Sequence, residues 1–330
     1  MEKIDETILS SHIFAHYTMD LESMRKCDIV VVGSGLSAMS SVYSILKSVA
    51  RKCSPPVKIA VLEKQDAIGT HNGTTGGIFP YTVVRKPAHK LLDETGMAGL
   101  YKDEGKFVVI ETSTLHSALL SKITHLASNH TGVELKFFPG IDVADILLED
   151  PMAFSPVKGL AASLSNTHHH SRSESDGPGP ANLDVPIFMG CKVIVSAGGL
   201  NQNTQNGLSR ALVRLNNYGF SGTSISDEPF LHRAVDVNLS EDAMIHYTRE
   251  VSPGLIAAGS EVCWLDYISH PPSVAGGGRL LSGLKAGKLA VHAVSKARES
   301  EFATIAGYET AAHFLHDDVV GGFTTDSLKP

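Results

Sequence analysis

The sequence reads Cys27-Asp28-Ile29-Val30-Val31-Val32-Gly33-Ser34-Gly35-Leu36-Ser37-Ala38 where a run of β-branched residues meets a pair of glycines. An uninterrupted apolar run of this kind is typical of a central parallel strand that is buried on both faces. Residues 38–49 then follow a helical pattern, and a second apolar run over 57–62 predicts another strand. This order of strand, turn, helix and strand is a βαβ unit, which predicts a parallel sheet with a right-handed crossover.

The glycine turn has the spacing G-x-G-x-x-A, from Gly33 through Gly35 to Ala38. In such a turn the first glycine makes a tight bend and the second lets the backbone approach a pyrophosphate. The small third residue lets the helix pack closely on the strand. The free N–H groups at the start of the helix face the phosphate charge. Glu63 ends the second strand, where an acid accepts hydrogen bonds from ribose hydroxyls. The segment therefore predicts a site for an adenine dinucleotide.

Composition narrows the class of protein. The chain has 330 residues, is 42% apolar and 19% charged, and carries a net charge of −7. A negative charge argues against nucleic acid as a partner, because phosphate binding needs a basic surface. No apolar run is long enough for a bilayer, and the acidic first residues lack the apolar core of a secretory signal. The four cysteines have neither zinc spacing nor a disulfide pattern. We therefore expect a cytoplasmic protein with reduced thiols and no membrane contact.

The chain divides into three parts by pattern. We expect a helical lead-in over residues 1–26, one integrated dinucleotide-binding domain over 27–300, and a tail over 301–330. Within the domain, the polar Gly/Pro-rich residues 165–186 predict a mobile loop, whose three adjacent histidines we expect to be solvated rather than metal-bound. The other expected strands are 106–110, 133–138, 143–148, 159–164, 192–196 and 255–259, and the other expected helices are 113–126 and 282–295.

Further motifs follow the glycine turn in a fixed order. They are Val83-Val84-Arg85-Lys86-Pro87-Ala88-His89, Leu92-Asp93-Glu94, Asp103-Glu104-Gly105, Asp236-Val237-Asn238, Glu241-Asp242-Ala243, Thr248-Arg249-Glu250-Val251-Ser252-Pro253-Gly254, Gly259-Ser260-Glu261-Val262 and Ser282-Gly283-Leu284-Lys285-Ala286. This ordered set resembles the thiamine thiazole synthase family of eukaryotes and archaea, whose members build an adenylated thiazole from NAD and glycine. The resemblance implies an α/β, glutathione-reductase-like dinucleotide-binding fold. Such a fold has a Rossmann-type parallel sheet with an attached smaller antiparallel sheet. The resemblance also implies a homo-oligomer, since members of the family assemble as octamers.

The resemblance also implies a cofactor, NAD or an ADP-ribose-type nucleotide, lying along the glycine turn. In the family Gly69 would be a phosphate-loop glycine, the backbone of Val143 would face the adenine, and Ser260 stands where methionine is usual. Carried over position by position, the cofactor-binding residues are Gly33, Gly35, Ser37, Glu63, Lys64, Gly69, Val143 and Ser260.

The sequence departs from the family where its sulfur and iron chemistry lies. Eukaryotic members donate sulfur from the cysteine of a Cys-Met-Asp-Pro stretch, but here Asn182 stands at the cysteine and Asp184 at the acid. The iron-binding histidine of the family's Gly-His-Asp-Gly-Pro turn reads Leu200, and the acid after it reads Asn201. Leucine cannot coordinate iron, and asparagine has no sulfur to donate. We therefore expect neither a bound metal nor self-donated sulfur.

The chemistry that remains is proton transfer and carbonyl chemistry, which needs acids and bases. Our catalytic candidates are His270, Asp184 and Asp266, with His89 as readily a capping or packing residue. His270 stands where the family has an arginine that holds the glycine carboxylate, and Arg279 is a nearby substitute.

Three functions stay open on these residues. One is a divergent enzyme that acts on NAD or an ADP-ribose-type nucleotide, with a small-molecule partner such as an amino acid. Another is an FAD- or NAD-dependent oxidoreductase on the same scaffold. The third is a pseudoenzyme that only binds nucleotide.

Overall fold

The structure is a computed structural model that describes residues 5–49, 55–69, 80–150, 155–164, 186–198, 237–265 and 275–320. Its helices are α1 (Glu6–Ser23), α2 (Leu36–Ser48), α3 (Lys90–Glu94), α4 (Thr112–Ser128), α6 (Val237–Tyr247), α7 (Ser260–Leu265) and α8 (Gly277–Val320). Its strands are β1 (Ile29–Val32), β2 (Val57–Glu63), β3 (Tyr81–Arg85), β4 (Lys102–Asp103), β5 (Phe107–Glu111), β6 (Val133–Pro139), β7 (Ile141–Leu148), β8 (Val157–Leu164), β9 (Ile187–Gly190), β10 (Val193–Ser196), β11 (Arg249–Ser252) and β12 (Leu255–Ala257).

The largest sheet has the strand order β11-β12-β10-β1-β2-β6. Strand β1 pairs in parallel with both β10 and β2, so that Ile29 faces Val193 on one side and Ile59 on the other. Strands β12 and β6 extend the parallel set, and β11 closes the edge in antiparallel orientation. The predicted βαβ unit is thus confirmed as β1, α2 and β2, and β1 is an interior strand.

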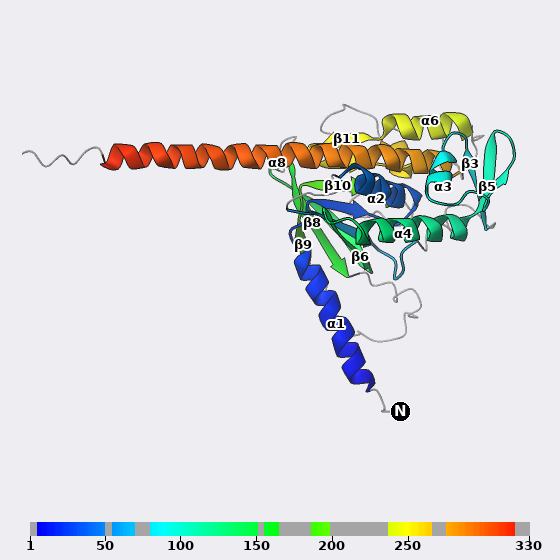
Figure 1. Cartoon of the computed structure of the whole chain (residues 1–330), viewed down its shortest axis with the longest axis horizontal. Coiled ribbons are helices and arrows are strands. Elements are labelled where there is room, and N and C mark those ends of the chain that lie inside the picture. The colour runs from blue at the N-terminus through cyan, green and yellow to red at the C-terminus, as the bar shows by residue number, and fades with distance from the viewer. Residues whose placement is uncertain are drawn as a thin grey trace, which may run out of the picture.

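Alternate residues of β1 feed two separate cores. Ile29 and Val31 pack with residues of α2, α4 and α8 on one face of the sheet. Val30 packs with Leu160 and Met189 of the sheet β7-β8-β9 on the other face. Burial on both sides explains why the strand is β-branched without polar alternation. Figure 1 shows the same arrangement, with α2, α4 and α8 as a helical layer over the strands.

Helices α2 and α8 approach closely because small residues line their contact. A Cβ on Gly283 would lie 2.2 Å from the carbonyl oxygen of Ser37, and one on Gly287 would lie 2.4 Å from that of Ser41. The Ser44 hydroxyl donates to the carbonyl oxygen of Leu284 at 2.8 Å. The serine-rich start of α2 therefore serves helix packing as well as the glycine turn.

Two small antiparallel sheets flank the parallel one, with the orders β3-β5-β4 and β7-β8-β9. The predicted hairpin of 143–148 with 159–164 is found as β7 and β8. The predicted helix over 282–295 is too short, because α8 begins at Gly277 and continues to Val320. No proline interrupts that span, so nothing in the sequence ends the helix earlier. The loop predicted over 165–186 lies outside the described residues except for Pro186.

Helix α1 projects from the body of the protein, which it meets at the C-terminal end of the helix (Figure 1). It is held there by an edge-to-face contact of Tyr17 with Phe138 and by a 2.7 Å ion pair between Asp20 and Lys136. Ile13 and Phe14, farther from the body, are each 71% exposed. In the described part of the chain, no helix combines the length and the apolar character that a membrane crossing requires.

Candidate functional site

The carboxyl ends of neighbouring parallel strands meet at one edge of the large sheet. Strand β1 ends at Val32, directly before Gly33, and β2 ends at Glu63. Ala197 and Gly198 follow the end of β10, and Gly259 lies two residues after the end of β12. Ligands of open α/β sheets bind outside this edge, where helices leave adjacent strands in different directions. The predicted glycine turn and the predicted ribose acid therefore lie at the edge where a dinucleotide would bind.

Gly33 is required by its backbone conformation and by its neighbours. Its φ is +100°, and a Cβ there would lie 2.5 Å from the Cα of Gly198 and 2.8 Å from the carbonyl oxygen of Ala197. Its N–H donates to the carbonyl oxygen of Leu62 at 2.7 Å, which ties the turn to β2. The bend thus brings β1, β2 and β10 together at one point.

Gly35 has a different role from Gly33. It is the N-cap of α2, with φ −71° and ψ −179°, a conformation that any residue adopts. No side chain caps the helix at this position. The backbone conformation therefore does not require glycine at position 35. The absence of a side chain there, at a helix start without a side-chain cap, leaves the backbone open to an approaching phosphate.

Ser34 connects the turn to the acid of β2. It is 1% exposed, and its hydroxyl donates to Glu63 Oε2 at 2.5 Å. The other carboxylate oxygen of Glu63 accepts from the N–H of Gln65 at 3.0 Å. Each oxygen keeps a further lone pair, so Glu63 is fixed in orientation and still able to accept from two ribose hydroxyls.

Gly69 closes the other side of this cluster. Its φ is +83°, and its N–H donates to the Ser34 hydroxyl oxygen at 2.7 Å. The ring of His116, on α4, occupies the position where a side chain at residue 69 would lie, because a Cβ there would be 2.0 Å from the ring. The His116 Nε2 is 2.9 Å from the carbonyl oxygen of Ser34. Ser34 and His116 are site residues that the sequence motifs did not predict.

The other predicted cofactor residues surround this edge in different ways. Ser37 is buried in the first turn of α2, and a Cβ on Gly259 would lie 2.4 Å from its hydroxyl oxygen. Ser260 begins α7 directly after that glycine. Lys64 forms a 2.7 Å ion pair with Asp142. The start of α2 at Ser37 therefore lies against Gly259, the residue before Ser260.

Val143 lies on β7 and its side chain is 3% exposed. It packs in the core that includes Leu62, and its backbone faces Ala162 of β8 in the antiparallel ladder. The Val143 side chain is therefore a core residue.

A second buried acid, Glu261, lies at the same edge. Glu261 is 3% exposed and accepts a short hydrogen bond from the Ser196 hydroxyl at the end of β10. A Cβ on Gly198 would approach Glu261 Oε1 to 3.7 Å. Glu261 belongs to the motif Gly259-Ser260-Glu261-Val262, but the motif alone gives it no role, because only the fold brings it beside β10.

Arg279, the predicted substitute for the carboxylate-binding arginine, lies in the first turn of α8. Burial lowers the pKa of its guanidinium, and the nearby Cys263 and Glu241 act in the opposite direction. Glu241 is itself 1% exposed and pairs with Arg85 Nε at 3.2 Å. Burial raises the pKa of Glu241, and backbone N–H groups of Gly278 and Gly277 together with Arg85 offset part of that rise. This cluster joins α6, β3 and α8.

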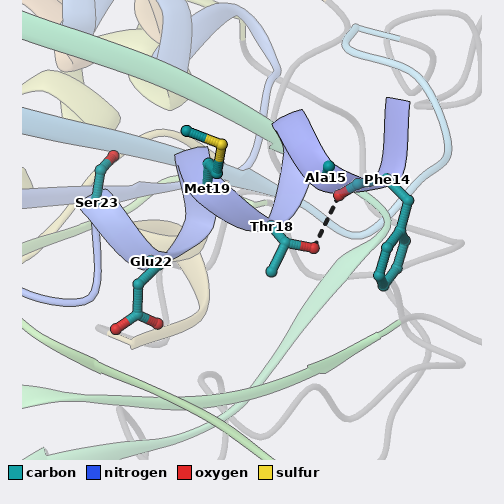
Figure 2. Close-up of a pocket in the computed structure, with 6 residues that line it drawn as sticks. All are labelled: Phe14, Ala15, Thr18, Met19, Glu22 and Ser23. Atoms are coloured by element: carbon teal, nitrogen blue, oxygen red, sulfur yellow. Dashed lines mark hydrogen bonds between the residues drawn. The ribbon is translucent and has the colours of Figure 1, made fainter. Parts of the chain in front are cut away.

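A hollow on α1 is separate from this edge. Every residue that lines it belongs to α1, namely Phe14, Ala15, Thr18, Met19, Glu22 and Ser23 (Figure 2). Figure 2 also shows the Thr18 hydroxyl donating to the carbonyl oxygen of Phe14, at 2.8 Å. The hollow contains none of the predicted site residues.

Comparison with known proteins identifies the family. The model of the Thi4 family matches residues 10–270. The chloroplastic thiamine thiazole synthase of Arabidopsis thaliana is 30% identical over 298 residues, which cover 89% of this chain and 74% of that protein. The chain belongs to the Thi4 family. The resemblance predicted from the ordered motifs is thereby confirmed.

Another curated relative is consistent with the Thi4 family, and two solved structures share the fold. The thiamine thiazole synthase of Candida albicans strain SC5314 is 28% identical over 327 residues, covering 93% of this chain and 86% of that protein. Among solved structures, Thermovibrio ammonificans THI4 has a TM-score of 0.67 at 19% identity, covering 89% of this chain and all of that chain (100%). The apo Mycobacterium smegmatis Sdh1 complex has a TM-score of 0.51 at 11% identity, covering 92% of this chain and 74% of that chain. The predicted fold class is confirmed.

The structure does not test the predictions on catalytic residues, iron and location for this Thi4 family chain. The catalytic candidates His270, Asp184 and Asp266, and the departures at Asn182, Leu200 and Asn201, lie outside the described residues. Among the residues that the structure describes, no group of three or more His, Cys, Asp or Glu side chains is arranged to hold a metal ion. The absence of iron stays a prediction from the sequence, as does the cytoplasmic location, since the Arabidopsis relative is named chloroplastic.

Proposed function

We propose that this chain is a thiazole synthase-like enzyme that binds NAD or an ADP-ribose-type nucleotide along Gly33–Gly35 and processes it without self-donated sulfur. The observation that carries the proposal is the cluster at the carboxyl edge of the sheet. There a tight glycine turn, a helix start without a side-chain cap, and the buried Glu63 meet. Family membership supports an enzyme, because the thiamine thiazole synthases it resembles are enzymes.

The cluster fits an adenine dinucleotide part by part. The first N–H groups of α2, after the N-cap Gly35, offer donors and the positive end of a helix dipole to a pyrophosphate. Glu63 offers two oxygens, each with one protein donor and one lone pair still available, to the two hydroxyls of a ribose. NAD, ADP-ribose and FAD all share this adenosine diphosphate half.

The proposed reaction uses proton transfer and carbonyl chemistry at the far end of the nucleotide. The absence of self-donated sulfur follows from the sequence, because Asn182 stands where the eukaryotic family members have their donor cysteine. Leu200 likewise cannot serve as the iron ligand that the family has at that turn. An amino acid is the proposed second substrate, and the acid–base groups are His270, Asp184 and Asp266.

The test begins with the purified protein and the small molecules that accompany it. Mass spectrometry of the released ligand should find NAD, ADP-ribose or a product derived from them. A yellow flavin would instead assign the oxidoreductase alternative, and intact NAD that is never turned over would assign a pseudoenzyme.

Calorimetric titration with NAD and ADP-ribose then tests the site itself. Gly35→Val should abolish binding, because its side chain would occupy the path of the pyrophosphate. Gly190→Ala is the control for loss of a glycine elsewhere, since a Cβ at that position meets its nearest atom at an ordinary 3.6 Å. Unchanged affinity in a folded Gly35→Val protein would contradict the proposal.

A further inference from the structure

Ser34 is the centre of the candidate site although it is not one of the glycines of the motif. Its hydroxyl donates to Glu63 Oε2 at 2.5 Å and accepts from the N–H of Gly69 at 2.7 Å. Its carbonyl oxygen is 2.9 Å from the Nε2 of His116. The orientation of this one buried residue is therefore set from three segments of the chain.

His116 contacts two of these segments, the one that contains Ser34 and the one that contains Gly69. A carbonyl oxygen can only accept, so the Nε2 of His116 carries the proton and donates to Ser34. The same ring fills the space beside Gly69, where a Cβ would be 2.0 Å from Cε1 and 2.4 Å from Nδ1. His116 is 7% exposed, so solvent does not readily replace this donor.

The consequence reaches Glu63 through Ser34. Because Ser34 is held at both its carbonyl and its hydroxyl, its O–H can point at only one oxygen of the Glu63 carboxylate. This hydrogen bond fixes the orientation of the carboxylate and therefore the direction of its remaining lone pairs. A carboxylate oriented before the ligand arrives costs less to organise when the ligand binds.

We propose that His116 is a positioning residue for ribose recognition, acting through Ser34 on the Glu63 carboxylate. This inference rests on the proposed function, because it needs an adenine nucleotide at the glycine turn. His116 would contact neither the ribose nor the phosphates. It would instead decide how well the site distinguishes a ribose diol from a sugar that lacks it.

The experiment measures ADP and 2′,3′-dideoxy-ADP binding by isothermal titration calorimetry on the full-length protein. Loss of one well-placed hydrogen bond in a desolvated site corresponds to about tenfold in affinity. His116→Leu should therefore weaken ADP binding about tenfold and leave dideoxy-ADP binding unchanged. His116→Gln, whose amide can again donate to Ser34, should recover part of the difference. His125→Leu, the same change at an exposed position of the same helix, should alter neither affinity.

Ser34→Ala removes only a hydroxyl and serves as the second variant should His116→Leu fold poorly. It should show the same selective loss for ADP. Equal weakening of both ligands in His116→Leu and Ser34→Ala would mean that these residues only support the turn, and it would overturn the inference while the proposed function stands. A wild-type protein that binds neither ADP nor NAD would overturn the proposed function, and the positioning role with it.

Discussion

Replacing Gly33 by alanine should lower the free energy of unfolding more than the same change at a glycine that has a positive φ but open space around its Cβ position. At φ +100° an alanine pays about 1–2 kcal/mol for its conformation alone. Its Cβ would also overlap the backbone of β10, at 2.5 Å from the Cα of Gly198 and 2.8 Å from the carbonyl oxygen of Ala197. Forcing an atom into packed surroundings costs about 1–3 kcal/mol.

The two costs add to about 2–5 kcal/mol, because the turn cannot move away from β10. The 2.7 Å hydrogen bond from its N–H to the carbonyl oxygen of Leu62 holds it from the other side. Proteins are stable by about 5–15 kcal/mol, so such a loss is large enough to measure and small enough to leave a folded protein.

Gly105→Ala provides the matched control. Gly105 has φ +80°, but a Cβ there would have no atom within 4 Å. This variant should lose only the conformational part, about 1–2 kcal/mol. Urea unfolding of both variants at one fixed protein concentration gives the comparison. Equal losses in Gly33→Ala and Gly105→Ala would refute the reasoning, because they would mean that the contact with β10 carries no cost.

Three other results are expected. Burial alone would raise the pKa of Asp28, but hydrogen bonds from Arg298 and from the Lys58 N–H, with the charges of Arg298 and Lys192, lower it overall. Asp28→Asn should therefore cost about 2 kcal/mol in urea unfolding at pH 7. The difference from wild type should shrink as the pH falls below about 4, since a lowered pKa stabilises only while the acid is ionised, and a constant difference would contradict this. Burial, then the charge of Asp28, raises the pKa of the Cys27 thiol to about 12, so iodoacetamide at pH 8 should modify it only after unfolding, and rapid labelling of the native protein would contradict this. The intact mass should stay unchanged after incubation with NAD and glycine, whereas conversion of any cysteine to dehydroalanine would show self-donated sulfur.

Local patterns in the sequence were sufficient for the scaffold. The β-branched run before Gly33 predicted an interior strand because a strand with two buried faces has no place for alternating polar residues. The glycine spacing and Glu63 predicted a dinucleotide site, and both could be located in the sequence because each stands at the end of a predicted strand. The length of α8 was underestimated: the predicted helix ended at residue 295, whereas the helix continues to Val320 through a span without proline.

The sequence by itself thus determined the βαβ unit, the glycine turn and the family, because each is written in neighbouring residues or in an ordered set of motifs. Only the tertiary structure decided which side chains organise the turn. Ser34 is 29 residues from Glu63, 35 from Gly69 and 82 from His116, and each pair is joined by a hydrogen bond. A histidine on a helix gives no local sign of such a partner. Its contact with Ser34 exists because the sheet places α2 and α4 side by side and because Gly69 leaves room for the ring.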